Sequence, residues 1–195
     1  MNRNIWLFLI LFIVGCSGSP KIETQLYLLT PTTHKSSTDI SKQQTQNAKN
    51  IIVLESIKLA EFLDQPGIVL QTDKHQIQVA HYHRWAEPLS QNIHRFILET
   101  LSSQSTKYSF QKQTKFAKEV SHLVLSLEVN QFNGTSEGVA MLSGHWELKD
   151  SKLNKLIMTK SFYFEEPMTE SGYPELVNQL ALMLDKICVN ILASI

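Results

Sequence analysis

The C-terminal segment carries the pattern that most restricts the fold. After Tyr173-Pro174, apolar side chains recur at helical spacing: Leu176, Val177, Leu180, Leu184, Ile187, Cys188 and Ile191. Such a stripe must be buried against another element. Burying five or six large side chains at about 1.5 to 3 kcal/mol each contributes on the order of 10 kcal/mol before conformational entropy is subtracted. The pattern predicts a core helix, and a charge at Leu180 or Leu184 should unfold the domain.

Alternating apolar and polar residues predict the sheet against which this helix packs. Three long runs, at 122–132, 139–148 and 156–164, read as an antiparallel meander, with Asn133-Gly134 and Glu137-Gly138 bracketing the first connecting loop. Shorter strands are predicted at 25–30, 51–54, 68–70 and 76–80, and Ile57 and Leu59 continue the alternation of the run that begins at Ile51. Pro66-Gly67 predicts a turn, and residues 73–75 suit a hairpin connection.

A second amphipathic helix follows Pro88, which is well placed in a first turn. Its apolar stripe is Leu89, Ile93, Phe96, Ile97 and Leu101, and its outward face is Gln91, Asn92, Arg95 and Glu99. The predicted fold class is therefore α+β: a single domain over residues 25–195, with a mainly antiparallel sheet of about five or six strands and two main amphipathic helices packed on it. Within it, residues 32–50 contain one strong hydrophobe among polar side chains and are predicted to be a flexible loop.

The N-terminus predicts export and lipidation. Residues 5–14 form an apolar run that would span about 15 Å as a helix, half of a bilayer's hydrocarbon core, so residues 1–15 are interpreted as a signal peptide. The tetrapeptide ending at Cys16 resembles a bacterial lipobox, in which the new N-terminal cysteine carries acyl chains such as palmitate. Residues 16–24 would then be a lipidated tether, held by chains that each contribute about 0.8 kcal/mol per buried methylene. The alternative is an ordinary secretory signal with an incidental cysteine.

Charge and cysteine content narrow the function classes further. The chain has 18 Lys and Arg against 18 Asp and Glu, which gives no indication of a nucleic-acid partner or a polybasic membrane patch. With Cys16 lipidated, Cys188 is the one free thiol, so no intramolecular disulfide is expected, and its place on the apolar stripe indicates a core residue.

One stretch, His81 to Leu89 (HYHRWAEPL), has the side chains of a chemical site. In a strand His81 and His83 would face the same way, a spacing that can bind zinc, but no third ligand stands at a recognisable offset. Glu87 could act as a general acid and Arg84 could hold an anion, yet no nucleophile or phosphate loop accompanies them. We favour a packing junction between strand and helix, and expect no catalytic residue, metal or other cofactor.

Two segments resemble the PqiC (YmbA) family of ABC-type transport auxiliary lipoproteins. They are Ile57 to Val69 (IKLAEFLDQPGIV) and Arg84 to Leu89 (RWAEPL), behind a lipobox and an early Tyr27-Leu28-Leu29. The family's segments read P-x-YLDRPQIV and RWAEPL at a similar distance. This chain departs from the family at three turn positions, Ala60, Gln65 and Gly67, and these substitutions bear on partner contacts more than on the fold.

The resemblance implies a role without catalysis. Members are periplasm-facing lipoproteins of the outer membrane that serve a Pqi-type system, in which an MCE-domain (PqiB-like) protein of the inner membrane forms a conduit for lipids. Ser17 follows the cysteine where aspartate is the usual inner-membrane retention signal, which resembles outer-membrane sorting. The implied structural or partner-contact motif is Asp64, Pro66, Arg84, Trp85, Glu87 and Pro88, beside lipidation at Cys16.

Three functions are therefore considered. The favoured one is a lipoprotein that docks to the MCE-domain protein, supports intermembrane lipid transport and envelope integrity, and forms a homo-oligomer at the end of the conduit. The second is a periplasmic lipid-binding carrier, which would need a concave apolar pocket in place of a filled core. The third is an envelope hydrolase.

Overall fold

The structure is a computed structural model, and it describes residues 23–31, 51–113 and 122–195. Its elements follow the chain in the order β1 (Gln25–Tyr27), β2 (Ile51–Leu54), β3 (Lys58–Leu59), η3 (Glu61–Leu63), β4 (Gly67–Asp73), β5 (Gln76–Trp85), α1 (Leu89–Gln104), β6 (Ser109–Lys112), β7 (Leu123–Thr135), β8 (Val139–Asp150), β9 (Lys155–Pro167) and α2 (Tyr173–Ser194). The predicted signal peptide, lipidation site, most of the tether and the predicted loop at 32–50 lie outside the described residues.

The sheet is built around β7. On one edge β7 pairs with β8, and β8 with β9, in the predicted antiparallel meander. Along its other edge β7 pairs in succession with three short strands, first β2, then β3, then β4, and all three are parallel to it. Beyond them β6 pairs with β2, β5 with β4, and β1 with β5, so the described residues form one nine-stranded sheet.

The predicted α+β class and the two helices are confirmed, but the sheet differs in detail. It has nine strands where five or six were predicted, and five of its eight ladders are parallel. The parallel ladders join segments of two to four residues that are far apart in the sequence. No local alternation reveals such pairings, and β6 lies in a polar stretch that carried no strand signal.

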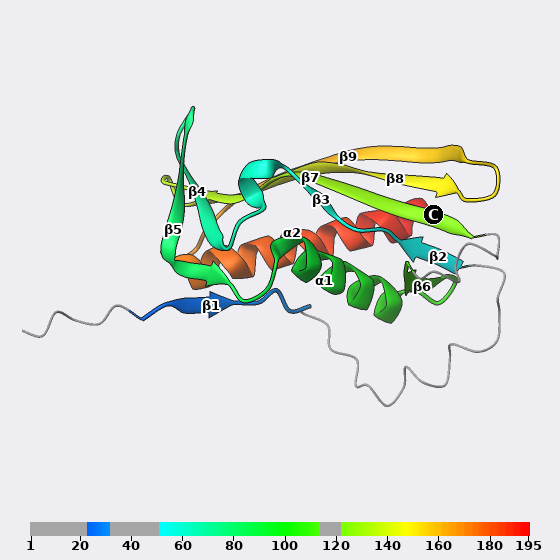
Figure 1. The fold of residues 1–195 in the computed structure, drawn as a ribbon, viewed down its shortest axis with the longest axis horizontal. Helices are drawn as coiled ribbons and strands as arrows, with labels where there is room; N and C mark the ends of the chain where they lie inside the picture. Colours follow the sequence, from blue (N-terminus) through cyan, green and yellow to red (C-terminus); the bar gives the residue numbers. More distant parts are fainter. Residues whose placement is uncertain (1–22, 32–50, 114–121) are drawn as a thin grey trace, which may run out of the picture.

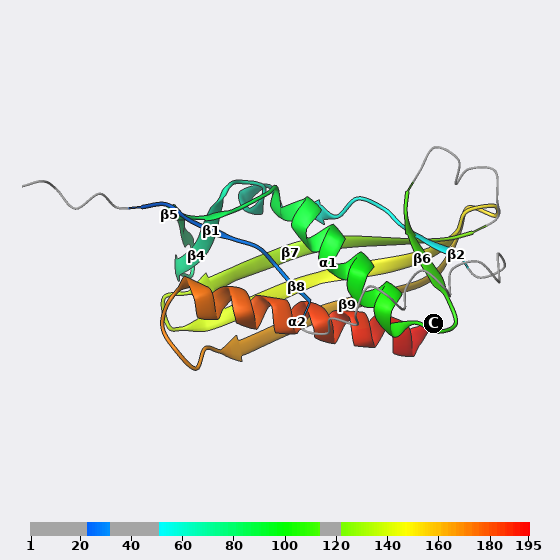
Figure 2. The same cartoon turned by 90° about the horizontal axis from the view of Figure 1, so that it is seen from below.

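α2 packs on one face of the meander, and α1 packs against α2 and β6. Figures 1 and 2 show α2 running beneath β7, β8 and β9, with α1 against it. Alternation aims Leu125, Leu127 and Val129 of β7 into this interface, and Trp146 of β8 joins them. By length and composition α2 could cross a membrane, but half of its most apolar window is buried, as expected for a core helix.

The first loop of the meander begins later than predicted. Asn133 and Gly134 lie inside β7 and are buried, and the chain turns at Ser136 and Glu137, with Gly138 at a φ of 79°. Gly134 is needed for a close approach: a Cβ there would lie 2.9 Å from Leu176 Cδ2. This glycine therefore marks the contact between β7 and the first turn of α2.

Candidate functional site

The stretch from His81 to Leu89 forms the junction between β5 and α1. β5 ends at Trp85, three residues connect, and α1 begins at Leu89. His81 is exposed, whereas His83 is half-buried and belongs to an aromatic cluster with Tyr27 and Tyr173. The Tyr27 hydroxyl lies 2.8 Å from His83 Nδ1, and the His83 ring stacks on Tyr173 with centroids 3.9 Å apart. The two histidines thus have different surroundings, and His83 joins β1 and β5 to α2.

Burial affects the chemistry of this aromatic cluster. It raises the pKa of Tyr173, and it raises the pKa of Tyr27, to which Tyr173 adds a smaller contribution. Both phenols therefore stay protonated at neutral pH. Among the described residues, no group of three or more His, Cys, Asp and Glu side chains is arranged to hold a metal ion. The cluster joins elements and has the geometry of a packing contact.

Trp85 lies in the core. It is 5% exposed, and its ring packs against Phe132 of β7 with centroids 5.9 Å apart. Its backbone N–H donates to the Pro66 carbonyl at 2.8 Å, and Arg84 is the register partner of Gly67. The two segments that carry the family resemblance therefore lie side by side, although they are separated in the sequence.

Glu87 anchors a polar network at the start of α1. Arg95 Nη2 donates to Glu87 Oε1 at 2.7 Å and to Asn92 Oδ1 at 3.0 Å. Asn92 Oδ1 also accepts the Leu29 N–H at 3.2 Å. Glu87 and Arg95 are each about one-third exposed, so their ion pair is partly screened by solvent. The network ties the chain after β1 to α1.

Asn92 corrects the predicted outward face of α1. Its side chain is fully buried and accepts a hydrogen bond from the backbone N–H of Leu29, whereas the prediction placed it in solvent. The helical period cannot reveal this, because Asn92 is covered by a segment 63 residues earlier in the chain. A polar residue beside an apolar stripe was the only available signal.

The remaining motif residues are exposed. Asp64 follows η3, Pro66 lies in the turn before β4, Arg84 is near the end of β5, and Pro88 precedes α1. The structure thus divides the motif in two. Trp85 is buried and Glu87 is paired, whereas the other four side chains are exposed to solvent.

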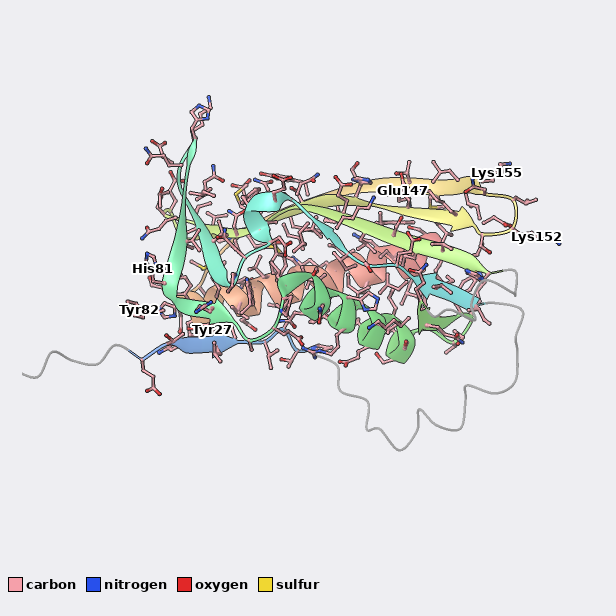
Figure 3. The ribbon with its side chains drawn as sticks, viewed as in Figure 1. Tyr27, His81, Tyr82, Glu147, Lys152 and Lys155 are labelled. Carbon is pink, nitrogen blue, oxygen red and sulfur yellow. The ribbon has the colours of Figure 1, made fainter. Side chains whose placement is uncertain are left out.

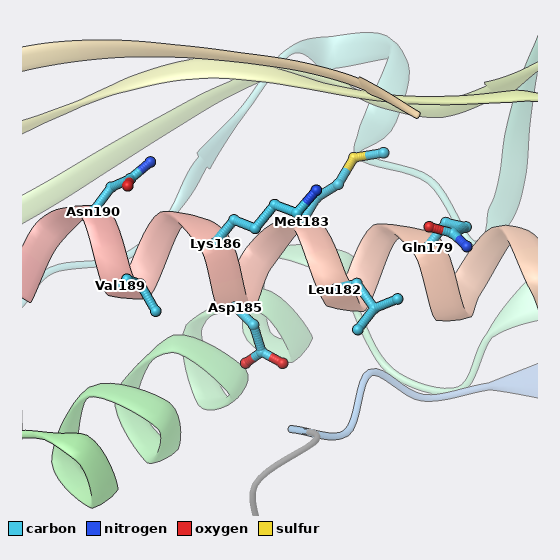
Figure 4. A pocket seen from close by; sticks show the side chains of 7 residues that line it. All are labelled: Gln179, Leu182, Met183, Asp185, Lys186, Val189 and Asn190. Carbon is cyan, nitrogen blue, oxygen red and sulfur yellow. The ribbon is translucent and has the colours of Figure 1, made fainter. Parts of the chain in front are cut away.

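A shallow groove follows one side of α2. It has a volume of about 460 Å³, and Figure 4 shows that α2 supplies all its labelled side chains, which are Gln179, Leu182, Met183, Asp185, Lys186, Val189 and Asn190. Its size is in the range of small-molecule sites, roughly 300 to 1,000 Å³. It is an open feature of the surface with polar and apolar lining residues, of which Met183 belongs to the core between helix and sheet.

Cys188 is a core residue, as predicted. It is fully buried in α2, and burial, with a smaller contribution from Asp185, raises the pKa of its thiol far above the usual range. A thiol that stays protonated is a poor nucleophile. This cysteine therefore contributes packing.

Comparison with known proteins covers nearly the whole chain. The chain is 27% identical over 178 residues to the intermembrane transport lipoprotein PqiC of Escherichia coli (strain K12), covering 90% of this chain and 89% of the relative, with the same values for PqiC of Shigella flexneri. A solved structure of an uncharacterized protein matches 87% of this chain and 96% of its own, with a TM-score of 0.72 and 24% identity. The crystal structure of a Xanthomonas campestris protein matches 86% of this chain and 92% of its own, with a TM-score of 0.66 and 14% identity.

The two solved structures support the fold alone. The sequence relationship goes further, because the family model described as ABC-type transport auxiliary lipoprotein component matches residues 27–192. That match runs from β1 to the last turn of α2 and includes both motif segments. The chain therefore belongs to the PqiC family of ABC-type transport auxiliary lipoprotein components.

Proposed function

We propose that this protein is an outer-membrane lipoprotein that faces the periplasm and docks to an MCE-domain protein of a Pqi-type lipid transport system. The observation that carries the proposal is the match to PqiC over 90% of the chain, behind a segment that ends in a lipobox at Cys16. In this role the folded domain performs no catalysis. Its task is to hold a receiving surface in place at the membrane where the conduit ends.

Three of the exposed motif residues, Asp64, Pro66 and Pro88, are proposed as partner contacts. Asp64 and Pro66 lie on a short turn that is held rigidly, because Pro66 accepts the Trp85 N–H and Trp85 is packed into the core. A turn fixed in this way loses little conformational entropy when a partner binds. The buried half of the motif thus positions the exposed half, and both halves are needed for docking.

A homo-oligomer is proposed to form along β9. In the described part of the chain, β9 pairs on one edge only and leaves a 13-residue edge with exposed Leu156, Ile157 and Tyr163. Long free edges readily pair with another chain. A second copy adding its own strand or side chains there would satisfy these backbone groups and cover the apolar ones.

Photocrosslinking in intact envelopes tests both contacts separately. A photoreactive amino acid at Asp64 should capture the MCE-domain protein, and one at Tyr163 should capture a second copy of this chain. The exposed Gln91 on α1 is the matched control position and should capture neither. If no MCE-domain protein is recovered from position 64 while known envelope complexes survive, the docking proposal is rejected.

Membrane attachment is tested with Cys16→Ser. Because the lipobox cysteine is the proposed anchor, the variant should move from the outer-membrane fraction to the soluble periplasm and keep its circular dichroism spectrum. The fractionation is done in cells that lack the MCE-domain protein, so that a partner cannot retain the variant. A variant that still sediments with the outer membrane in those cells contradicts lipid anchoring.

The second candidate, a lipid carrier, would have to use the groove along α2, because the core between the helices and the sheet is filled. Leu182 and Val189 are the accessible apolar side chains of its lining, and an acyl chain could lie on them. Native mass spectrometry after mild purification distinguishes the two functions. A carrier would retain a stoichiometric phospholipid that Leu182→Glu abolishes, whereas a docking protein would be recovered with its covalent anchor alone.

A further inference from the structure

The β1–β5 pair presents two faces of opposite character. β1 runs parallel to the end of β5, with Leu26 beside Arg84 and Tyr27 beside Trp85. Side chains alternate between faces along a strand. Tyr27 and His83 point inward, where they meet Tyr173. Leu26 and Arg84 therefore point outward, and so does Tyr82, two residues before Arg84.

The outward side chains are unusually apolar for such an open position. Leu26 is 64% exposed and Tyr82 46%, and Leu28, which continues the alternation beyond β1, is 48% exposed. Single exposed leucines are common on protein surfaces. Here two leucines lie beside a tyrosine and an exposed arginine, and this combination is typical of membrane–water interfaces. We call Leu26, Leu28, Tyr82 and Arg84 the interfacial face.

The position of the interfacial face relative to Cys16 indicates what covers it. Only seven residue steps separate Cys16 from Glu23, where the described chain begins. At no more than about 3.6 Å per residue, that length spans at most about 25 Å. With lipid on Cys16, β1 must therefore lie close to the bilayer. The turn between β8 and β9 lies at the opposite end of the molecule, where Figure 3 labels Lys152 and Lys155.

We propose that the interfacial face rests on the head-group region of the bilayer that holds the lipid of Cys16. The inference rests on the proposed lipid anchor and adds a second, non-covalent contact. Leu26 and Leu28 would enter the acyl boundary, the Tyr82 ring would lie at the head-group level, and the Arg84 guanidinium would donate to lipid phosphates, which match its fork of N–H groups. The anchor keeps the effective lipid concentration high, so a weak contact suffices.

The consequence is a fixed orientation of the domain. β1 is tied to the rest of the molecule by the Ala86 N–H donating to the Tyr27 carbonyl at 2.9 Å, by the Tyr27–His83 contact, and by the Leu29 N–H on Asn92. A face held this firmly cannot settle on a membrane independently of the domain. Contact of the interfacial face would therefore direct the β8–β9 turn away from the bilayer.

The test places a fluorophore at either end of the full lipidated chain. A cysteine is introduced at Leu28 or, as the matched control, at Leu153, which is 69% exposed in the β8–β9 turn. Each is labelled with a thiol-reactive, environment-sensitive dye, which does not react with Cys188 because that thiol is buried. The proteins are reconstituted into vesicles of phosphatidylethanolamine and phosphatidylglycerol that carry a head-group nitroxide. We expect a blue shift and a loss of fluorescence at position 28, and neither at position 153.

Vesicle flotation, measured in parallel, separates the two proposals. Protein that does not float shows that the lipid anchor has failed. Floating protein that is quenched equally at both positions, or at neither, overturns the interfacial face. A blue shift at position 28 without nitroxide quenching also overturns it, because protein and not lipid then covers the face. A further variant, Arg84→Glu, should reduce the quenching at position 28 while flotation stays unchanged.

Discussion

Replacing Trp85 with alanine tests whether the strand-to-helix junction is a packing contact. The indole is 5% exposed and lies against Phe132, so the substitution leaves a cavity between β5 and β7. Truncations of this kind cost about 3 to 5 kcal/mol. For a domain of this size each kcal/mol lowers the melting temperature by about 2 to 4 °C, so a decrease of about 6 to 20 °C is expected.

The measurement is thermal unfolding followed by circular dichroism, in the Cys16→Ser background so that no lipid is present. Tyr82→Ala is the matched control, since it also removes an aromatic ring from β5 but at a position that is 46% exposed. It should change stability by no more than about 0.5 kcal/mol. If Trp85→Ala behaves like Tyr82→Ala in thermal unfolding and instead abolishes partner capture, the packing interpretation is refuted and Trp85 is a contact residue.

Three further outcomes are expected. Gly134→Ala should cost about 1 to 3 kcal/mol in urea unfolding, because the new Cβ would crowd the β7–α2 contact; an unchanged midpoint would contradict this. Burial lowers the pKa of His94, with a smaller contribution from Lys112, so the unfolded chain takes up a proton at higher pH than the folded protein does. The contribution of His94 to the free energy of unfolding should therefore be constant above about pH 6.5 and decrease below it until the folded pKa is passed. His94→Gln should flatten that slope. Cys188 should react with a thiol reagent only after denaturant is added, and rapid reaction of the native protein would show that α2 opens.

The elements predicted best are those whose signal is local. α2 and the β7–β9 meander each repeat their period over many residues, and both are found where the sequence predicts them. The sequence predicts a strand at β2 and treats β3 as its continuation, whereas the structure has two separate strands. Their parallel pairing with β7 was not predicted, because pairing between distant segments is decided by the packing of the whole sheet. β6 was missed because its four residues are mostly polar and one side chain, Phe110, carries all the burial.

The candidate site shows the same division. The sequence identified the two motif segments but could not say that they touch, because the Pro66–Trp85 hydrogen bond and the Arg84–Gly67 register depend on the β4–β5 hairpin. It also could not separate the buried Trp85 from the exposed Arg84 by residue type, since both suit a contact surface. The interfacial face was missed entirely. Its residues come from two segments more than fifty positions apart, and only the register of β1 on β5 brings them together.

The position of β7 in the sheet has a consequence for the order in which the protein can fold. β2, β3 and β4 each pair with β7, and their partner residues on β7 lie roughly sixty to seventy positions later in the sequence. None of these ladders can close until β7 has been synthesised and is free to pair, so the β7-facing edges of β2, β3 and β4 stay unpaired until then. Topologies with such distant contacts fold slowly, and slow folding prolongs exposure to aggregation. A chaperone that shields residues 51–85 during this interval would protect the step on which the whole sheet depends.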